Sequence, residues 1–307
     1  MHIIIDTDPG QDDAIAILLA MHLKGIEILG ITCVSGNVDI DKTTKNARKI
    51  CELAGRPETK VFRGCRKPIV RDGVSAADIH GECGMEGAEL PEPLECQEQT
   101  THAVQWMYET LNESSEPVTL CCLGPLTNVA TLLCMYDIAH KIDKIVMMGG
   151  CYFERGNITP SSEFNVYTDP EAFSCVLRSG INTVILPLDV THQALMSEEW
   201  LEKLKNEGTK ISQTAHRMLT SYGRRSMTEN SDLNGGPIHD PMVIAYLSYP
   251  EIFSGKEVHV DVETQSNLSL GSCIVDWYEK YKNPPNAKWI NHVDGDAFFK
   301  VLLKNLV

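Results

Sequence analysis

Short runs of apolar residues alternate along the chain with longer segments in which apolar residues recur at helical spacing. The short runs are continuously apolar, which predicts strands covered on both faces. We expect strands at His2–Asp6, Ile26–Cys33, Val118–Leu123, Lys144–Met148 and Thr183–Leu188. The intervening segments predict helices at Asp13–Lys24, Lys42–Ala54, Thr100–Asn112, Leu126–Met135, Pro170–Ser179 and Ser197–Asn206. Further strands are expected near Val258–Val262 and Cys273–Trp277, before a closing helix at Asp294–Leu306.

This alternation predicts an α/β fold. We expect one domain over residues 1–307, with a central, mostly parallel (mixed) β-sheet flanked by helices in a Rossmann-like arrangement. Two segments lack this alternation of strand and helix patterns and are predicted to be long loops. Gly64–Gln99 is rich in Gly, Pro and acidic residues, and Gly223–Pro237 is polar and contains glycine. Long loops in compact domains are usually functional or disordered.

Composition and charge narrow the classes of partner. Hydrophobic residues make up 43% of 307 residues, enough for a substantial core, and the formal net charge is −15. This charge argues against nucleic acid or an anionic membrane as partner, because both select basic surfaces. The longest apolar run, Ile15–Met21, is far short of the roughly 20 residues that span a bilayer, and no cleavable leader is apparent. The 11 cysteines form no C-x-x-C pair. We therefore expect a cytoplasmic protein with reduced, mostly buried thiols, including Cys83 and Cys151 as packing residues.

The candidate chemistry lies in one turn near the amino end. The sequence IIIDTDPGQDDAIAILL places Asp6, Asp8, Asp12 and Asp13 between a predicted buried strand and a predicted buried helix. Ligands of open parallel sheets bind outside the carboxyl ends of the strands, which is where this turn lies. A helix dipole stabilises one carboxylate there by roughly 0.3–1 kcal/mol, but converging carboxylates repel one another. A hard divalent cation, Ca²⁺ or Mg²⁺, would offset that repulsion.

Other interpretations of this turn stay open on local sequence alone. One aspartate can cap the helix while the others face water. A metal-dependent phosphatase, with the first aspartate of a D-x-D strand end as nucleophile, also fits the turn, although it needs a lysine and a downstream acidic pair. An EF-hand is excluded because the Gly at the sixth loop position and the Glu at the twelfth are missing. A Walker P-loop is excluded for lack of G-K-[ST].

Six motifs, in order, carry a resemblance to a known family. DTDPGQDDAIA resembles the D-x-D-P-G-x-D-D-A-x-A signature of the nucleoside hydrolases, also called inosine–uridine-preferring nucleoside hydrolases. The later motifs of that family are similar to GNVDIDKTTKNA, DIHGECGM, LGPLTNVA, MMGGCYFERGNITPSSEFNVYTDPEA and GGPIHDP, up to about Tyr246. The resemblance implies the nucleoside hydrolase fold and hydrolysis of the N-glycosidic bond of purine or pyrimidine ribonucleosides. The products would be ribose and a free base, for nucleoside salvage or catabolism. It also implies one bound Ca²⁺ per subunit and a homodimer or homotetramer.

Carried over position by position, the resemblance also implies the site residues. The carboxylates of Asp8, Asp13 and Asp240 and the main-chain carbonyl of Leu123 would bind the metal. Asp8 would also take the proton of the attacking water, and His239 would act as the catalytic residue near the leaving base. This fits the chemistry, because cleavage of the glycosidic bond passes through an oxocarbenium-like state that carboxylates stabilise.

The resemblance also implies a set of substrate contacts. His80 would lie by the nucleobase, and the ribose contacts would be Asp12, Asn37, Met148, Asn157, Glu163 and Asn165. Some members carry a tyrosine about eight residues before the histidine, where this chain has Ser231. Tyr222, Arg224 or Arg225 are the alternatives for the base pocket, so the preferred base stays open. A non-catalytic nucleoside- or ribose-binding protein is the alternative from another functional class.

Overall fold

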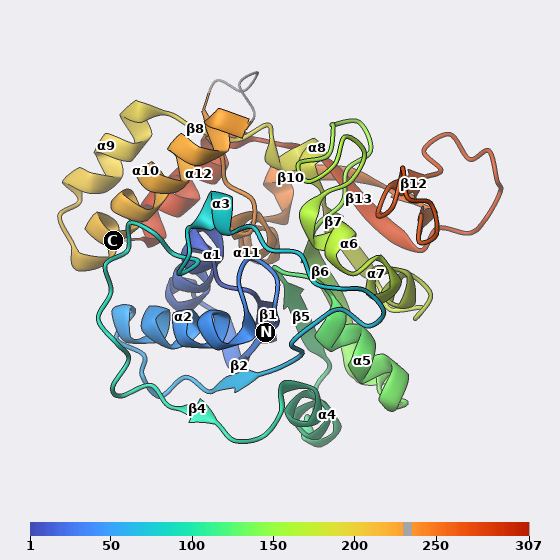
Figure 1. Ribbon diagram of the computed structural model, residues 1–307, viewed down its shortest axis with the longest axis horizontal. Coiled ribbons are helices and arrows are strands. Elements are labelled where there is room, and N and C mark those ends of the chain that lie inside the picture. Colours follow the sequence, from blue (N-terminus) through green and yellow to red (C-terminus); the bar gives the residue numbers. More distant parts are fainter. Residues whose placement is uncertain (230–234, 307) are drawn as a thin grey trace.

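A nine-stranded sheet runs through the centre of the protein (Figure 1). The structure is a computed structural model that describes residues 1–229 and 235–306. The strand order in the described residues is β10-β13-β7-β6-β5-β1-β2-β3-β4. Neighbouring strands pair in parallel except β10 with β13, which are antiparallel. The predicted α/β fold with a mostly parallel, mixed sheet is thereby confirmed. The strand bounds are β1 His2–Thr7, β2 Glu27–Cys33, β3 Val61–Arg63, β4 Glu98–Gln99, β5 Val118–Cys122, β6 Ile142–Met148, β7 Thr183–Leu186, β10 Phe253–Val258 and β13 Ala287–Val293.

Helices cover both faces of this sheet (Figure 1). Their bounds are α1 Gln11–His22, α2 Ile40–Leu53, α3 Ala77–His80, α4 Ala103–Glu113, α5 Thr127–Met135, α6 Phe164–Thr168, α7 Pro170–Leu177, α8 Leu188–Thr191, α9 Glu198–Asn206, α10 Lys210–Glu229, α11 Pro241–Ser248 and α12 Gly295–Asn305. Two short antiparallel pairs complete the description, β8 Leu195–Met196 with β9 Gly236–Pro237 and β11 Val260–Val262 with β12 Cys273–Val275. In the part of the chain described, no helix combines the length and apolarity needed to cross a membrane.

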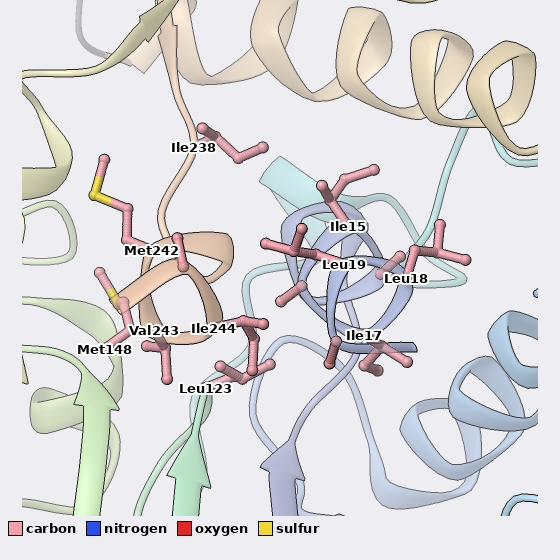
Figure 2. Packing of buried hydrophobic residues seen from close by; sticks show 14 of the residues in the cluster. Ile15, Ile17, Leu18, Leu19, Leu123, Met148, Ile238, Met242, Val243 and Ile244 are labelled. Carbon is pink, nitrogen blue, oxygen red and sulfur yellow. The ribbon is translucent and has the colours of Figure 1, made fainter. Parts of the chain in front are cut away.

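The two faces of the sheet explain the continuous apolar runs. In β1, Ile3 and Ile5 join the buried cluster that contains α1 and α11, whereas Ile4 joins the cluster that contains α4, α5 and α7. Side chains alternate across a strand, so a strand covered on both faces carries a continuous apolar run, as Ile3, Ile4 and Ile5 do here. Figure 2 shows the first cluster, where Leu19 of α1 and Ile244 of α11 lie between the two helices. Burying each such side chain stabilises the fold by about 1.5–3 kcal/mol.

The predicted loop at Gly223–Pro237 is wrong for its first part, because α10 continues to Glu229. Met218 and Leu219 of α10 are fully buried and hold the helix onto the core. The helix also packs closely against β9, since a Cβ on Gly236 would lie only 2.8 Å from the Gly223 Cα. Tertiary packing therefore overrides the polar, glycine-containing pattern.

The other differences are smaller. Gly64–Gln99 is irregular as expected, apart from the short α3 and β4, whereas β13 and α11 were not among the predicted elements. All 11 cysteines are free and most are buried, as expected. Cys151 is buried, but the interpretation of Cys83 as a packing residue is wrong because Cys83 is exposed.

Candidate functional site

One pocket lies where the loops after several parallel strands meet. The empty space between its lining residues is about 800 Å³, a volume that includes open solvent at its mouth. All the predicted site residues except Asp8 and Asp13 line it: Asp12, Asn37, His80, Leu123, Met148, Asn157, Glu163, Asn165, His239 and Asp240. Six segments far apart in the sequence thus converge on the carboxyl ends of the sheet, as the motif order predicts.

The floor of the pocket is a buried group of carboxylates. Asp12, Asp13 and Asp240 each place one oxygen so that the three lie within 4.8 Å of one another. Asp12 and Asp13 belong to the first turn of α1, and Asp240 precedes α11. Asp13 also accepts a hydrogen bond from the Gly10 N–H at 2.9 Å, which closes the first turn of the helix. The interpretation in which one aspartate caps and the others face water is therefore wrong, because all are at most 4% exposed.

Asp8 lies against the same floor and is held by the loops around it. Its Oδ2 accepts a hydrogen bond from the Asn37 N–H at 2.7 Å. A Cβ at Gly36 or at Gly124 would overlap its carboxylate oxygens, so both neighbouring loops must lack a side chain there. Gly124 directly follows Leu123, which brings the Asp8 carboxylate to the turn that carries the Leu123 carbonyl.

The electrostatics of this group require a counter-charge. Burial raises the pKa of Asp8, and the charges of Asp13 and Asp12 raise it further. Burial likewise raises the pKa of Asp240, with added repulsion from Asp12, Asp13 and Asp8. Asp13 and Asp240 also hydrogen-bond through their side chains, which raises the pKa of Asp240 further. Protons or a divalent cation can neutralise such a cluster, and clustered carboxylate oxygens with a nearby carbonyl are the donors that Ca²⁺ and Mg²⁺ bind.

The pocket is also lined by amide and carboxylate groups suited to sugar hydroxyls. Asn165 donates from Nδ2 to the Leu123 carbonyl at 2.7 Å, and this carbonyl keeps a second lone pair. Glu163 precedes α6 and accepts the N–H groups of Gly150 and Asn165, each at 2.9 Å. Burial raises the pKa of Glu163 to about 7. Asn157 accepts the Phe164 N–H at 2.9 Å, which ties its loop to the same helix.

Histidines also line the pocket. The Nδ1 atom of His239 lies 2.8 Å from the Thr191 hydroxyl, and Nδ1 of His80 lies 2.7 Å from the Gln11 side-chain oxygen. Burial lowers the pKa of His80 to about 3 and lowers that of His239 well below its usual value. Both rings are therefore neutral in the metal-free protein at pH 7.

Sequence reasoning missed His192, which lines the pocket with its ring 5.8 Å from that of His239. The signal was available, since His192 follows β7 closely, at the carboxyl edge where ligands bind. Of the three alternatives for the base side, Tyr222 lines the pocket and stacks on His80 at 5.5 Å between ring centroids. Arg225 instead pairs with Glu86. Ser231 lies outside the described residues.

Asp6, the remaining aspartate of the turn, faces the other side of the sheet. Its burial predicts a measurable dependence of the free energy of unfolding on pH. Its Oδ1 accepts hydrogen bonds from Thr32 at 2.5 Å and Asn128 at 2.8 Å, while its buried Oδ2 has no partner among the described residues. Burial raises its pKa from 3.8 to about 7. Between these values the folded state binds more protons than the unfolded state. Ionisation of Asp6 therefore lowers the free energy of unfolding as pH rises through this window, by an amount of order 4 kcal/mol.

We expect Asp6→Asn to remove this loss, because asparagine matches the protonated acid in shape and charge. Denaturant unfolding of both proteins at pH 4.5 and pH 8 measures the effect. The variant should gain several times more stability relative to wild type at pH 8 than at pH 4.5, because pH 4.5 lies near the lower end of the window. An equal stability difference at both pH values would show that Asp6 does not titrate on unfolding.

Comparisons with known proteins agree with this geometry. The family model described as inosine-uridine preferring nucleoside hydrolase matches residues 3–300. A pyrimidine-specific ribonucleoside hydrolase RihA from Salmonella schwarzengrund is 42% identical over 305 residues, which cover 99% of this chain and 97% of that protein. RihA from Photobacterium profundum is 40% identical over 305 residues, covering 99% and 98%. The solved structure of a purine-preferring ribonucleoside hydrolase from Gardnerella vaginalis has a TM-score of 0.92 at 28% identity, covering 100% and 98%.

Proposed function

The chain belongs to the inosine-uridine preferring nucleoside hydrolase family and is a hydrolase of ribonucleoside N-glycosyl bonds, and on this premise we propose that it works with one bound Ca²⁺ and prefers pyrimidine ribonucleosides. The observation that carries the proposal is the buried group Asp12, Asp13 and Asp240, with Asp8 beside it. We further propose that residues 1–307 form one nucleoside hydrolase domain.

The donor set fits a hard cation. Asp8, Asp13, Asp240 and the Leu123 carbonyl are all oxygen donors. Burial and mutual repulsion raise the pKa values of Asp8 and Asp240, and a bound cation would offset both effects. A carboxylate oxygen of Asp12 lies in the same cluster as those of Asp13 and Asp240. The family resemblance, in contrast, implies that Asp12 contacts the ribose. When bound, Ca²⁺ would coordinate adjacent ribose hydroxyls and lower the pKa of a water molecule.

The chain's own residues supply the other steps. Asp8, anchored by the Asn37 N–H, accepts the proton of the attacking water. Asn157, Glu163 and Asn165 orient the sugar through its hydroxyls, and the surrounding carboxylates stabilise positive charge on the ribose ring. His239, with Nδ1 engaged by Thr191, presents Nε2 on the side of the leaving base.

The proposed base preference rests on the relatives and on the pocket. The RihA proteins named pyrimidine-specific are 40–42% identical, whereas the purine-preferring structure is 28% identical. In this chain Tyr222 lines the pocket and stacks on His80, so it is placed to contact the base. Some members of the family carry a tyrosine that is nearer in sequence to the catalytic histidine.

Ribose release from a panel of nucleosides tests this function. We expect uridine and cytidine to be cleaved with a higher kcat/KM than inosine and adenosine. We also expect 2′-deoxyuridine to lose at least about 10³-fold, because the polar groups that bind the missing hydroxyl would be left unpaired. Binding of nucleosides without ribose release would instead indicate a binding protein, and phosphate release from nucleotides a phosphatase. Equal cleavage of uridine and 2′-deoxyuridine would contradict the diol-binding site.

Two expectations remain predictions, the assembly into a homodimer or homotetramer and the cytoplasmic location. Sedimentation velocity checks the first, with a dimer or tetramer expected and a monomer contradicting it. Microscopy of the tagged protein in its native cell checks the second.

A further inference from the structure

Two cysteines meet outside the pocket. The Sγ atoms of Cys134 and Cys175 lie 3.7 Å apart, although 41 positions separate them in the chain. Cys134 is exposed and Cys175 is partly buried, so small oxidants in solution can reach the pair.

The packing of two helices sets this distance. Cys134 lies in the last turn of α5 and Cys175 near the end of α7, and these helices lie side by side (Figure 1). Ala130 of α5 and Phe173 of α7 are buried in the same hydrophobic cluster. The Cys175 Sγ itself lies 4.0 Å from the carbonyl of Ala130.

A hydrogen bond fixes the opposite end of the helix pair. The Thr127 hydroxyl donates to the Asp169 carboxylate at 2.7 Å, joining the start of α5 to the residue before α7. The two thiols are therefore neighbours because rigid elements hold them together, in contrast to a chance approach of two loops.

We propose that Cys134 and Cys175 are a redox modification site, which a hydroperoxide converts reversibly into a disulfide that links α5 to α7. The bond would lie at the ends of these helices away from the pocket, since Leu123 precedes α5 and Asn165 lies before α7. We therefore expect the disulfide to change stability and leave turnover unchanged.

The chemistry balances with one hydroperoxide. The Cys134 thiolate attacks the peroxide, the O–O bond breaks, and a sulfenic acid forms with release of an alcohol, or of water from H₂O₂. Cys175 sulfur then attacks the sulfenic sulfur, and the oxygen leaves as water. Two thiols lose two electrons and two protons in total. The Sγ atoms must close from 3.7 Å to about 2.05 Å, a movement that rotation about χ1 can supply.

The order of the two steps follows from the environments. Burial and the hydrogen bond with Cys134 raise the pKa of Cys175 to about 11, so Cys175 remains a thiol while the exposed Cys134 reacts first. Cys51 and Cys96 also hydrogen-bond through their side chains but are fully buried, so the same oxidant does not reach them readily.

Mass spectrometry of the intact full-length protein tests the proposal. Treatment with about one equivalent of H₂O₂ should lower the mass by about 2 Da, and a thiol reductant should restore it. Proteolysis without reduction should give one linked peptide pair that contains Cys134 and Cys175. The melting temperature of the oxidised protein should rise by about 5 °C, because the cross-link restricts the unfolded chain over a loop of this length.

Variants separate this pair from the other thiols. Cys134→Ser and Cys175→Ser should each abolish both the mass loss and the rise in melting temperature. Cys83→Ser, which removes another exposed thiol, should retain both. The proposal is overturned if peroxide gives only sulfinic acid at Cys134, if the linked peptides join two chains, or if Cys83 is one of the linked residues. None of these outcomes depends on the nucleoside that the enzyme cleaves.

Discussion

Replacement of Asp8 by alanine lowers kcat by about 10³-fold or more in this account, while the protein stays folded. The reason is the double role of this carboxylate, which accepts the proton of the water and contributes to the metal site. A positioned general base alone supplies about 10²–10⁴-fold. The fold should tolerate the change, because removal of one buried carboxylate relieves its repulsion with Asp13 and Asp12.

Steady-state ribose release measures the loss, and circular dichroism with thermal melting checks the fold. Asp137→Asn is the matched control, since it removes one negative charge at an exposed position and should leave kcat unchanged. Asp8→Asn keeps the shape and the hydrogen bond from the Asn37 N–H but cannot take up a proton as a carboxylate does, so it should be nearly as inactive. Near-normal turnover in either Asp8 variant would remove this residue from the mechanism.

Removal of divalent cations is expected to abolish turnover completely and reversibly. Without a cation, burial and mutual repulsion raise the pKa values of Asp240 and Asp8, which disfavours both the ionised base and the negative charge around the sugar. The melting temperature should fall as well, because a ligand at 100 times its Kd stabilises the folded state by about 2.7 kcal/mol.

The experiment uses protein treated with EDTA and freed of the chelator, with metal content checked by elemental analysis. Added Ca²⁺ should restore both turnover and the melting temperature, and Mg²⁺ should restore less of each because it prefers a smaller, octahedral site. Asp240→Asn should show a weaker response of the melting temperature to Ca²⁺. Full turnover by protein that is free of metal would contradict the assignment of a cofactor.

The sequence predicted the parts of the fold where local pattern and packing agree. Ile3–Ile5 of β1 and all of β5 except Thr119 are apolar because helices cover both faces of these strands, and the apolar runs could be identified as strands for that reason. The pattern failed at α10, where polar residues and Gly223 hid a helix that tertiary contacts stabilise. β13 was missed because its pairing with β10 and β7 is settled by distant parts of the chain.

The candidate site was likewise predicted only in part from the sequence. Motif order was enough to predict that Asp12, Asn165 and Asp240 would share one pocket. It could not predict that Asn165 donates to the Leu123 carbonyl, since that contact depends on how α6 is placed against β5. His192 was missed because a single histidine carries little information until its distance from His239 is known.

The central claim is that the buried aspartates bind Ca²⁺ and that this ion holds the ribose. Anomalous diffraction from crystals grown with Ca²⁺ and soaked with ribose tests it most directly. We predict one strong peak bounded by oxygens of Asp8, Asp13, Asp240 and Leu123, with two adjacent ribose hydroxyls at the ion. Absence of a peak there at saturating Ca²⁺, or ribose bound through other groups, would contradict the account.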